Sequence, residues 1–136
     1  MYLLDTNVVS ETRKPGPYGA VLAWIQTVPD QPLHLSAVTV GEIQAGIEIT
    51  RERDVAKALA IEAWLDQIAR TYNVLPMDAA VFRRWAHLMH RKPYHHMEHA
   101  MIAATALIHG LTVVTRNVRD FELFGLKPLN PFEFVG

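Results

Sequence analysis

Short apolar runs alternate along the chain with longer stretches in which apolar residues recur at helical spacing. The runs that predict strands are residues 1–4, 33–35 and 111–115, with a brief strand or connector at 73–76. The run at 111–115 is the clearest because it is rich in β-branched residues. An apolar run without polar alternation, such as 1–4, is typical of a strand buried on both faces, as in parallel sheets.

The stretches between these runs predict helices, because their apolar residues fall on one stripe and their charged residues fall outside it. Asp78 is expected to cap the start of one helix, and Gly110 is expected to end the next. Pro29 and Pro93 are expected to break the helices before them. The predicted helices cover about 17–27, 39–47, 52–70, 78–91 and 98–109. Alternating helices and strands predict an α/β layered fold with a parallel sheet.

Composition narrows the class of protein further. With 136 residues, half of them hydrophobic and 20% charged, the chain suits a single soluble domain over 1–136. It has no cysteine, which excludes disulfides and thiolate zinc sites. A formal charge of −1 means that the whole molecule does not attract nucleic acid, although local patches still can. Since no run spans a membrane and residues 1–7 lack a signal-peptide pattern, we expect a cytoplasmic protein.

Polar side chains follow the predicted strands, at the edge of the sheet where ligands bind in parallel α/β folds. Clustered carboxylates there would repel one another unless a cation lay between them, and Mg²⁺ and Mn²⁺ prefer such oxygen ligands. Each acid also has a simpler interpretation, as a turn cap for Asp5, a solvated helix residue for Glu42, and a helix N-cap for Asp120. Spacing alone leaves the metal site as the less favoured hypothesis. The polar residues at this edge are Asp5, Thr6, Asn7, Glu42, Thr115, Arg116, Asn117 and Asp120.

Four segments, which follow one another with gaps of plausible length, make the metal site the favoured interpretation. They are Met1–Asn7, Ser36–Ile43, Met101–Ala106 with His109–Leu111, and Thr115–Phe121. Together they resemble PIN domains over nearly the whole chain, and within that group the VapC toxins, including the FitB-like members.

The resemblance implies a PIN-like three-layer α/β fold, with a central parallel sheet flanked by helices, formed by one domain over 1–136. It implies a metal-dependent endoribonuclease that is the toxin of a type II toxin–antitoxin module. Asp5, Glu42 and Asp120 would bind Mg²⁺ or Mn²⁺, with Thr6, Asn7, Thr115 and Asn117 in support. The implied partners are a cognate antitoxin, an RNA substrate for which tRNA is a reasonable expectation, and a second copy of the chain in a homodimer and toxin–antitoxin hetero-oligomer.

One position departs from the family pattern. An Asp is expected two residues before Met101, and His99 stands there. Imidazole in place of a carboxylate removes one negative charge, so Mg²⁺ should bind less well and Mn²⁺ or Zn²⁺ should be tolerated better. The neighbouring Glu98 should point about 100° away around the helix and is an imperfect substitute. We therefore expect attenuated activity, through selected or deliberate inactivation or through an altered metal preference.

Two other clusters have both a functional and a simpler interpretation. Arg83, Arg84, Arg91 and Lys92 make a basic helix end that either contacts RNA phosphates or is merely solvated. His95, His96 and His99 suggest a zinc site, but a polar loop after Pro93 is the better interpretation. The main alternative function is a catalytically silent PIN module that works through antitoxin or RNA binding; a histidine-based zinc protein is the weaker third.

Overall fold

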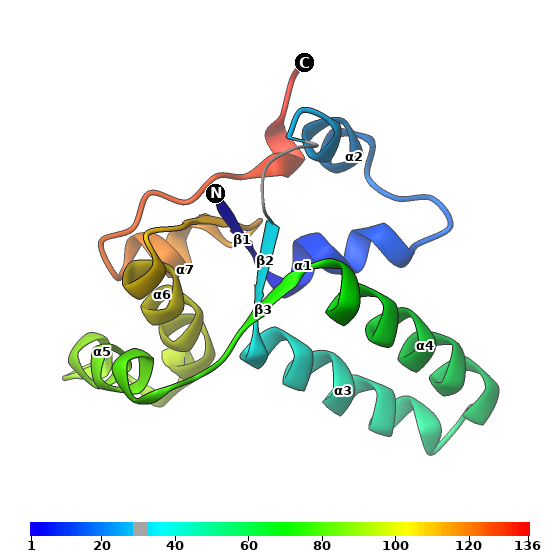
Figure 1. The fold of residues 1–136 in the computed structure, drawn as a ribbon, viewed down its shortest axis with the longest axis horizontal. Coiled ribbons are helices and arrows are strands. Elements are labelled where there is room, and N and C mark those ends of the chain that lie inside the picture. The colour runs from blue at the N-terminus through cyan, green and yellow to red at the C-terminus, as the bar shows by residue number, and fades with distance from the viewer. Residues whose placement is uncertain (29–32) are drawn as a thin grey trace.

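The computed structural model describes residues 1–28 and 33–136, and its centre is a parallel sheet (Figure 1). In the described residues the sheet has four strands in the order β3-β2-β1-β4. The strands are β1 (Tyr2–Leu4), β2 (Leu33–Ser36), β3 (Asn73–Leu75) and β4 (Thr112–Val114). All three pairings are parallel, with Leu3 opposite Val113 on one side and His34 on the other. The predicted parallel sheet is confirmed.

The helices pack on both faces of this sheet. The helices α1 to α4 pack on one face, and the helices α5 to α7 pack on the other (Figure 1). The bounds are α1 (Thr6–Val9), α2 (Gly19–Gln26), α3 (Ala37–Arg51), α4 (Val55–Thr71), α5 (Ala79–Met89), α6 (Met97–His109) and α7 (Val118–Glu122), with short 3₁₀ turns at Ser10–Arg13, Tyr94–His96 and Pro131–Glu133.

Successive strand residues enter different cores, which explains why the strands carry unbroken apolar runs. Leu4 and Val114 pack in the core under α1 to α4, whereas Leu3 and Val113 pack in the core under α5 to α7. All four side chains are almost fully buried. The expected three-layer α/β fold is therefore confirmed, and hydrophobic burial on both faces holds the sheet in place.

The helix boundaries follow local capping chemistry. The Asp78 carboxylate accepts a 3.0 Å hydrogen bond from the Val81 amide at the start of α5, as predicted. Gly110 ends α6 in the left-handed conformation, with φ of 64°. The helix α5 stops at Met89, ahead of Pro93. Pro29, expected to end α2, lies outside the described residues.

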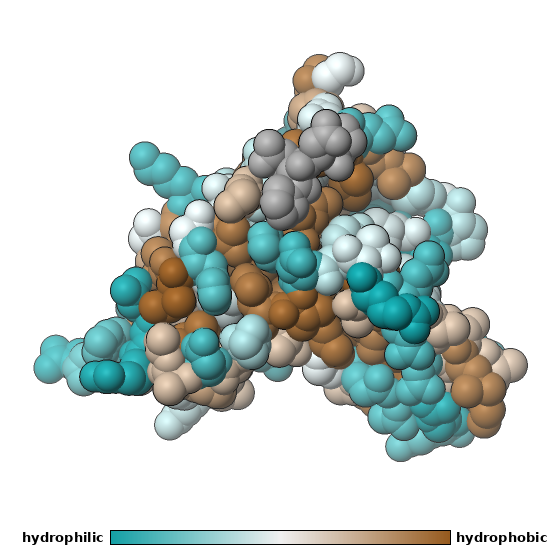
Figure 2. Space-filling view, viewed as in Figure 1, coloured by the Kyte–Doolittle hydropathy of each residue, from teal (hydrophilic) through white to brown (hydrophobic). Residues whose placement is uncertain are grey.

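The face of the molecule in Figure 2 shows both hydrophobic and hydrophilic residues, with hydrophobic ones visible near its centre. Along α3 and α4, the exposed apolar side chains include Ile49, Val55 and Leu59. In the part of the chain that is described, no helix combines the length and apolar character needed to cross a membrane.

Candidate active site

The carboxyl ends of the parallel strands bring the predicted polar residues together. Asp5 directly follows β1 and caps α1, and Thr115 directly follows β4. Ser36, the last residue of β2, caps α3 through a 3.1 Å hydrogen bond from the Val38 amide. That cap fixes the start of the helix that carries Glu42.

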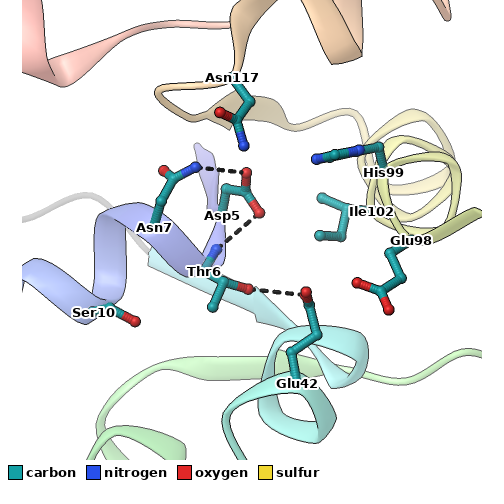
Figure 3. A pocket seen from close by; sticks show the side chains of 9 residues that line it. All are labelled: Asp5, Thr6, Asn7, Ser10, Glu42, Glu98, His99, Ile102 and Asn117. Carbon is teal, nitrogen blue, oxygen red and sulfur yellow. Dashed lines mark hydrogen bonds between the residues drawn. The ribbon is translucent and has the colours of Figure 1, made fainter. Parts of the chain in front are cut away.

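Asp5 is the most firmly held of these side chains (Figure 3). Its carboxylate accepts hydrogen bonds from the Thr115 hydroxyl at 2.7 Å and from the Thr6 amide at 2.8 Å. The Asn7 amide nitrogen donates a third, longer bond at 3.3 Å. Asp5 is only 4% exposed, and burial raises its pKa although the Thr115 hydrogen bond opposes that effect. The environment therefore penalises the negative charge and leaves a cation as the natural compensation.

Glu42 reaches the same place from α3. The Thr6 hydroxyl donates a 3.0 Å hydrogen bond to its carboxylate, which links the Asp5 segment to α3. Burial, followed by the nearby Glu98 carboxyl, raises the pKa of Glu42 to about 7. Burial is the larger cause of this shift, and the neighbouring carboxyl group adds to it.

Glu98, expected from the sequence to be an imperfect substitute for the acid, also lines the site. Its side chain lies on the same side of the pocket as that of Glu42 (Figure 3). The angle of about 100° between successive helical residues describes only the Cα–Cβ directions. A glutamate side chain has further torsions, and in the first turn of α6 they turn its carboxyl toward α3.

His99 lies beside Glu98 but makes its contacts on the other side, with α7. Its Nε2 atom is 3.8 Å from an Asp120 carboxylate oxygen. Its ring also meets the Phe121 ring edge-on, with centroids 5.3 Å apart. The first turn of α6 thus contacts α3 through Glu98 and α7 through His99.

Asp120 occupies the border of the site. It lies within α7 and is not its N-cap, which is Asn117. Asp120 lines an adjacent polar cleft of about 550 Å³, and its charge still acts on Asp5. Asn117 lines both hollows and therefore connects them. A role for Asp120 as a metal ligand stays a prediction.

The pocket itself has a volume of about 260 Å³. Its described lining contains three carboxylates and one imidazole but no lysine or arginine. The full lining set is Asp5, Thr6, Asn7, Ser10, Glu42, Glu98, His99, Ile102 and Asn117. Two of these, Ser10 and Ile102, carried no signal in the sequence that set them apart from ordinary loop and core residues.

The expected supporting residues form one connected network around Asp5. The Asn117 amide donates to the Thr115 hydroxyl at 2.9 Å, and that hydroxyl donates to Asp5. The Arg116 amide donates to the Asn7 side-chain oxygen at 3.2 Å. The loop after β4 is thereby tied to the loop after β1, which sets the orientation of the Asp5 carboxylate.

The basic cluster is not part of this pocket. Arg83 and Arg84 lie on α5, and Arg91 and Lys92 follow that helix. The Lys92 ammonium lies 5.6 Å from the Phe124 ring centroid. Arg91 has a φ of 63°, a conformation that is uncommon outside glycine. Their contact with RNA stays a prediction.

The donor set suits a divalent cation chemically, although its side chains are not drawn together around one point. Among residues 1–28 and 33–136, no three histidine, aspartate or glutamate side chains are grouped closely enough to hold a metal ion. This also applies to the histidines after Pro93, where the His95 and His96 rings lie 4.0 Å apart. Nevertheless, a buried and a half-buried carboxyl group of raised pKa, Asp5 and Glu42, without a lysine or arginine beside them in the pocket, are what a hard cation stabilises.

Comparison with known proteins assigns this architecture to a family. The family model described as PIN domain matches residues 2–125, so the chain belongs to the PIN-domain family. The chain is 37% identical to "VapC ribonuclease Y4jK" of Sinorhizobium fredii over 140 residues, which cover 98% of this chain and 99% of that protein. It is 33% identical to "Toxin FitB" of Neisseria gonorrhoeae, with 97% and 99% covered.

Solved structures give the same result. The crystal structure of FitAcB from Neisseria gonorrhoeae matches with a TM-score of 0.86 and 32% identity, covering 98% of this chain and all of that one. The structure of FitAB bound to an IR36 DNA fragment matches with a TM-score of 0.83 and 30% identity, covering 100% and 99%. The family resemblance inferred from the sequence is confirmed.

Proposed function

We propose that this chain is a metal-dependent endoribonuclease and the toxin of a type II toxin–antitoxin pair. The observation that carries the proposal is the meeting of Asp5 and Glu42 in one pocket, at the carboxyl edge of the sheet in a PIN fold. Relatives covering the whole chain are named as a ribonuclease and as a toxin, which supports the assignment.

Asp5 and Glu42 would hold the ion from the pocket, with Asp120 at its border, and their oxygen donors suit Mg²⁺ or Mn²⁺. A divalent ion in such a site supplies polarisation of a phosphoryl oxygen and activation of water. The protein orients Asp5 through Thr115, Thr6 and Asn7, and orients Glu42 through the Thr6 hydroxyl. These bonds fix two carboxylates from distant parts of the chain in one orientation.

The substrate and partners follow from the family. We propose cellular RNA as the substrate, with tRNA as the expected class, and the cytoplasm as the place of action. Arg83, Arg84, Arg91 and Lys92 remain candidate phosphate contacts. The likeness to the FitAB and FitAcB structures supports an antitoxin partner. We propose that this antitoxin covers the pocket. The exposed apolar helix residues support a homodimer, which light scattering would detect as twice the monomer mass.

The experiment compares RNA cleavage by the purified chain with cleavage by Asp5→Asn, in Mg²⁺, in Mn²⁺ and after chelation. Glu52→Gln, a change of an exposed glutamate at the end of α3, serves as the matched control. We expect metal-dependent cleavage that Asp5→Asn abolishes and Glu52→Gln preserves. Equal cleavage by all three proteins, or cleavage that survives chelation, would contradict the proposal.

A second candidate function is a catalytically silent PIN module that acts by binding its antitoxin or RNA. Two points favour it. By the resemblance noted in the sequence, His99 stands at an expected acid position, and among the described residues no three acid or histidine side chains are grouped closely enough to hold a metal ion. It predicts antitoxin or RNA binding with no cleavage in either metal. Cleavage lost in Asp5→Asn would eliminate this candidate.

A further inference from the structure

The first turn of α6 presents two neighbouring side chains to opposite sides of the pocket. Glu98 and Glu42 of α3 both line the pocket, with their carboxyl groups on the same side of it (Figure 3). His99 faces α7, where it contacts Asp120 and Phe121. His99 therefore lines the pocket on its α7 side, while Glu98, one residue earlier, lines it on its α3 side.

We propose that Glu98, and not His99, supplies the metal-binding side chain of α6, so that Asp5, Glu42 and Glu98 form the ligand set of this protein. The inference rests on the proposed function, because it concerns the same ion. It assigns to His99 and Asp120 a separate place, as a pair at the border between the pocket and the adjacent cleft.

Three features of the structure support this division of roles. The carboxylates that line the pocket are those of Asp5, Glu42 and Glu98, whereas Asp120 lines the adjacent cleft. The His99 ring is held edge-on against Phe121, which is completely buried, so its direction is set by the core. Glu98 is exposed, and the open side of the pocket leaves its side chain room to turn toward an ion.

Charge leads to the same assignment. With His99 in the family's acid position, Asp5 and Glu42 alone bring two negative charges to the pocket. Glu98 adds a third negative charge, from the position just before His99 on α6. A divalent ion held by three carboxylates is favoured over one held by two, because Mg²⁺ and Mn²⁺ depend on charged oxygen ligands.

The test measures metal binding directly, without RNA. Free Mn²⁺ is followed by electron paramagnetic resonance, and Mg²⁺ by competition, for the full chain and for five variants. Asp5→Asn reports on the site as a whole, Glu98→Gln on the proposed ligand, His99→Gln on its neighbour, and Glu52→Gln on general surface charge. Circular dichroism confirms that each variant is folded, and Glu98→Ala provides a second removal of the same carboxylate.

We expect Glu98→Gln and Glu98→Ala to raise the Mn²⁺ dissociation constant about tenfold or more. His99→Gln and Glu52→Gln should leave it within about threefold of the parent value. The inference is overturned if Asp5→Asn abolishes binding while both Glu98 variants bind normally, or if His99→Gln weakens binding as much as Glu98→Gln. If Asp5→Asn also binds normally, the metal site itself is wrong, and the proposed function fails with it.

Discussion

The Thr115 hydroxyl donates a 2.7 Å hydrogen bond to an Asp5 carboxylate oxygen, joining residues 110 positions apart in the sequence. Thr115 is completely buried, and it follows β4 just as Asp5 follows β1. The parallel pairing of these two central strands is what brings the hydroxyl and the carboxylate together. This hydrogen bond therefore connects the fold of the sheet to the chemistry of the pocket.

Replacing Thr115 by valine should weaken both stability and cleavage. Valine keeps the shape but leaves a buried carboxylate oxygen without its shortest donor, at a cost of about 1–3 kcal/mol in the free energy of unfolding. It should also raise the pKa of Asp5 further, since the Thr115 hydrogen bond lowers it. Urea denaturation and the pH profile of cleavage measure the two effects. Thr115→Ser should retain most of both, and a valine variant as stable and active as the parent would contradict the role given to this bond.

Glu42→Gln should stabilise the metal-free protein at pH 8. The folded-state pKa of about 7 lies above the ordinary value of 4.5, so the folded protein resists losing this proton. Stability contributed by the neutral form is present at low pH and is lost as pH rises from about 4.5 to about 7. Glutamine has no proton to lose, and the gain at pH 8 should be on the order of 2 kcal/mol.

Urea denaturation in the presence of a chelator, at pH 5 and pH 8, measures this gain. The control is Glu48→Gln on the same helix, whose carboxylate pairs with Arg51 and whose pKa is lowered. That variant should show no stabilisation at pH 8. If Glu42→Gln is no more stable than the parent at pH 8, burial and the nearby Glu98 carboxyl do not raise the pKa of Glu42.

Arg91→Gly should stabilise the fold, because Arg91 adopts a φ of 63° just after α5. Glycine takes that conformation without a Cβ clash, and relief of the strain should outweigh the extra flexibility of the unfolded chain by about 0.5–1 kcal/mol. Thermal melting of Arg91→Gly and Arg91→Ala distinguishes strain from loss of the side chain, because alanine keeps the strain. Equal melting temperatures for the two variants would show that the backbone here is not strained.

The sequence predicted the fold well because its signals are strong over long segments. The apolar runs identified all four described strands to within about a residue, and Asp78 and Gly110 marked helix boundaries through their own chemistry. The helices α1 and α7 were missed. They have four and five residues, which is too short for a helical period to show.

The site was predicted less completely, for a different reason. Asp5, Glu42 and His99 do share one pocket, because strand order and helix caps fix where their backbones lie. Glu98 was considered an imperfect substitute from the directions of Cα–Cβ bonds, but its carboxyl is several torsions away from Cα and lines the pocket. Asp120 was placed with the other acids, yet α7 turns it toward the neighbouring cleft. Side-chain directions of this kind depend on packing that sequence spacing does not encode.

His99→Asp should increase Mg²⁺-dependent RNA cleavage. The substitution adds a carboxylate beside Asp5 and Asp120, where an imidazole now contacts Asp120 at 3.8 Å. The added negative charge favours a divalent ion, and a gain of about tenfold corresponds to roughly 1.4 kcal/mol of recovered transition-state stabilisation.

Cleavage rates of the parent, His99→Asp and His99→Gln in each metal test this prediction, together with the growth of cells that express each protein without an antitoxin. His99→Gln isolates loss of the imidazole from gain of the acid, and it should cleave RNA as the parent does. His99→Asp should also be the most toxic of the three. If His99→Asp leaves cleavage unchanged while Asp5→Asn abolishes it, residue 99 lies outside the catalytic site, and the expectation that His99 attenuates the activity is wrong. In that case the α6 acid that matters is Glu98 alone, because its carboxyl already lines the pocket beside that of Glu42.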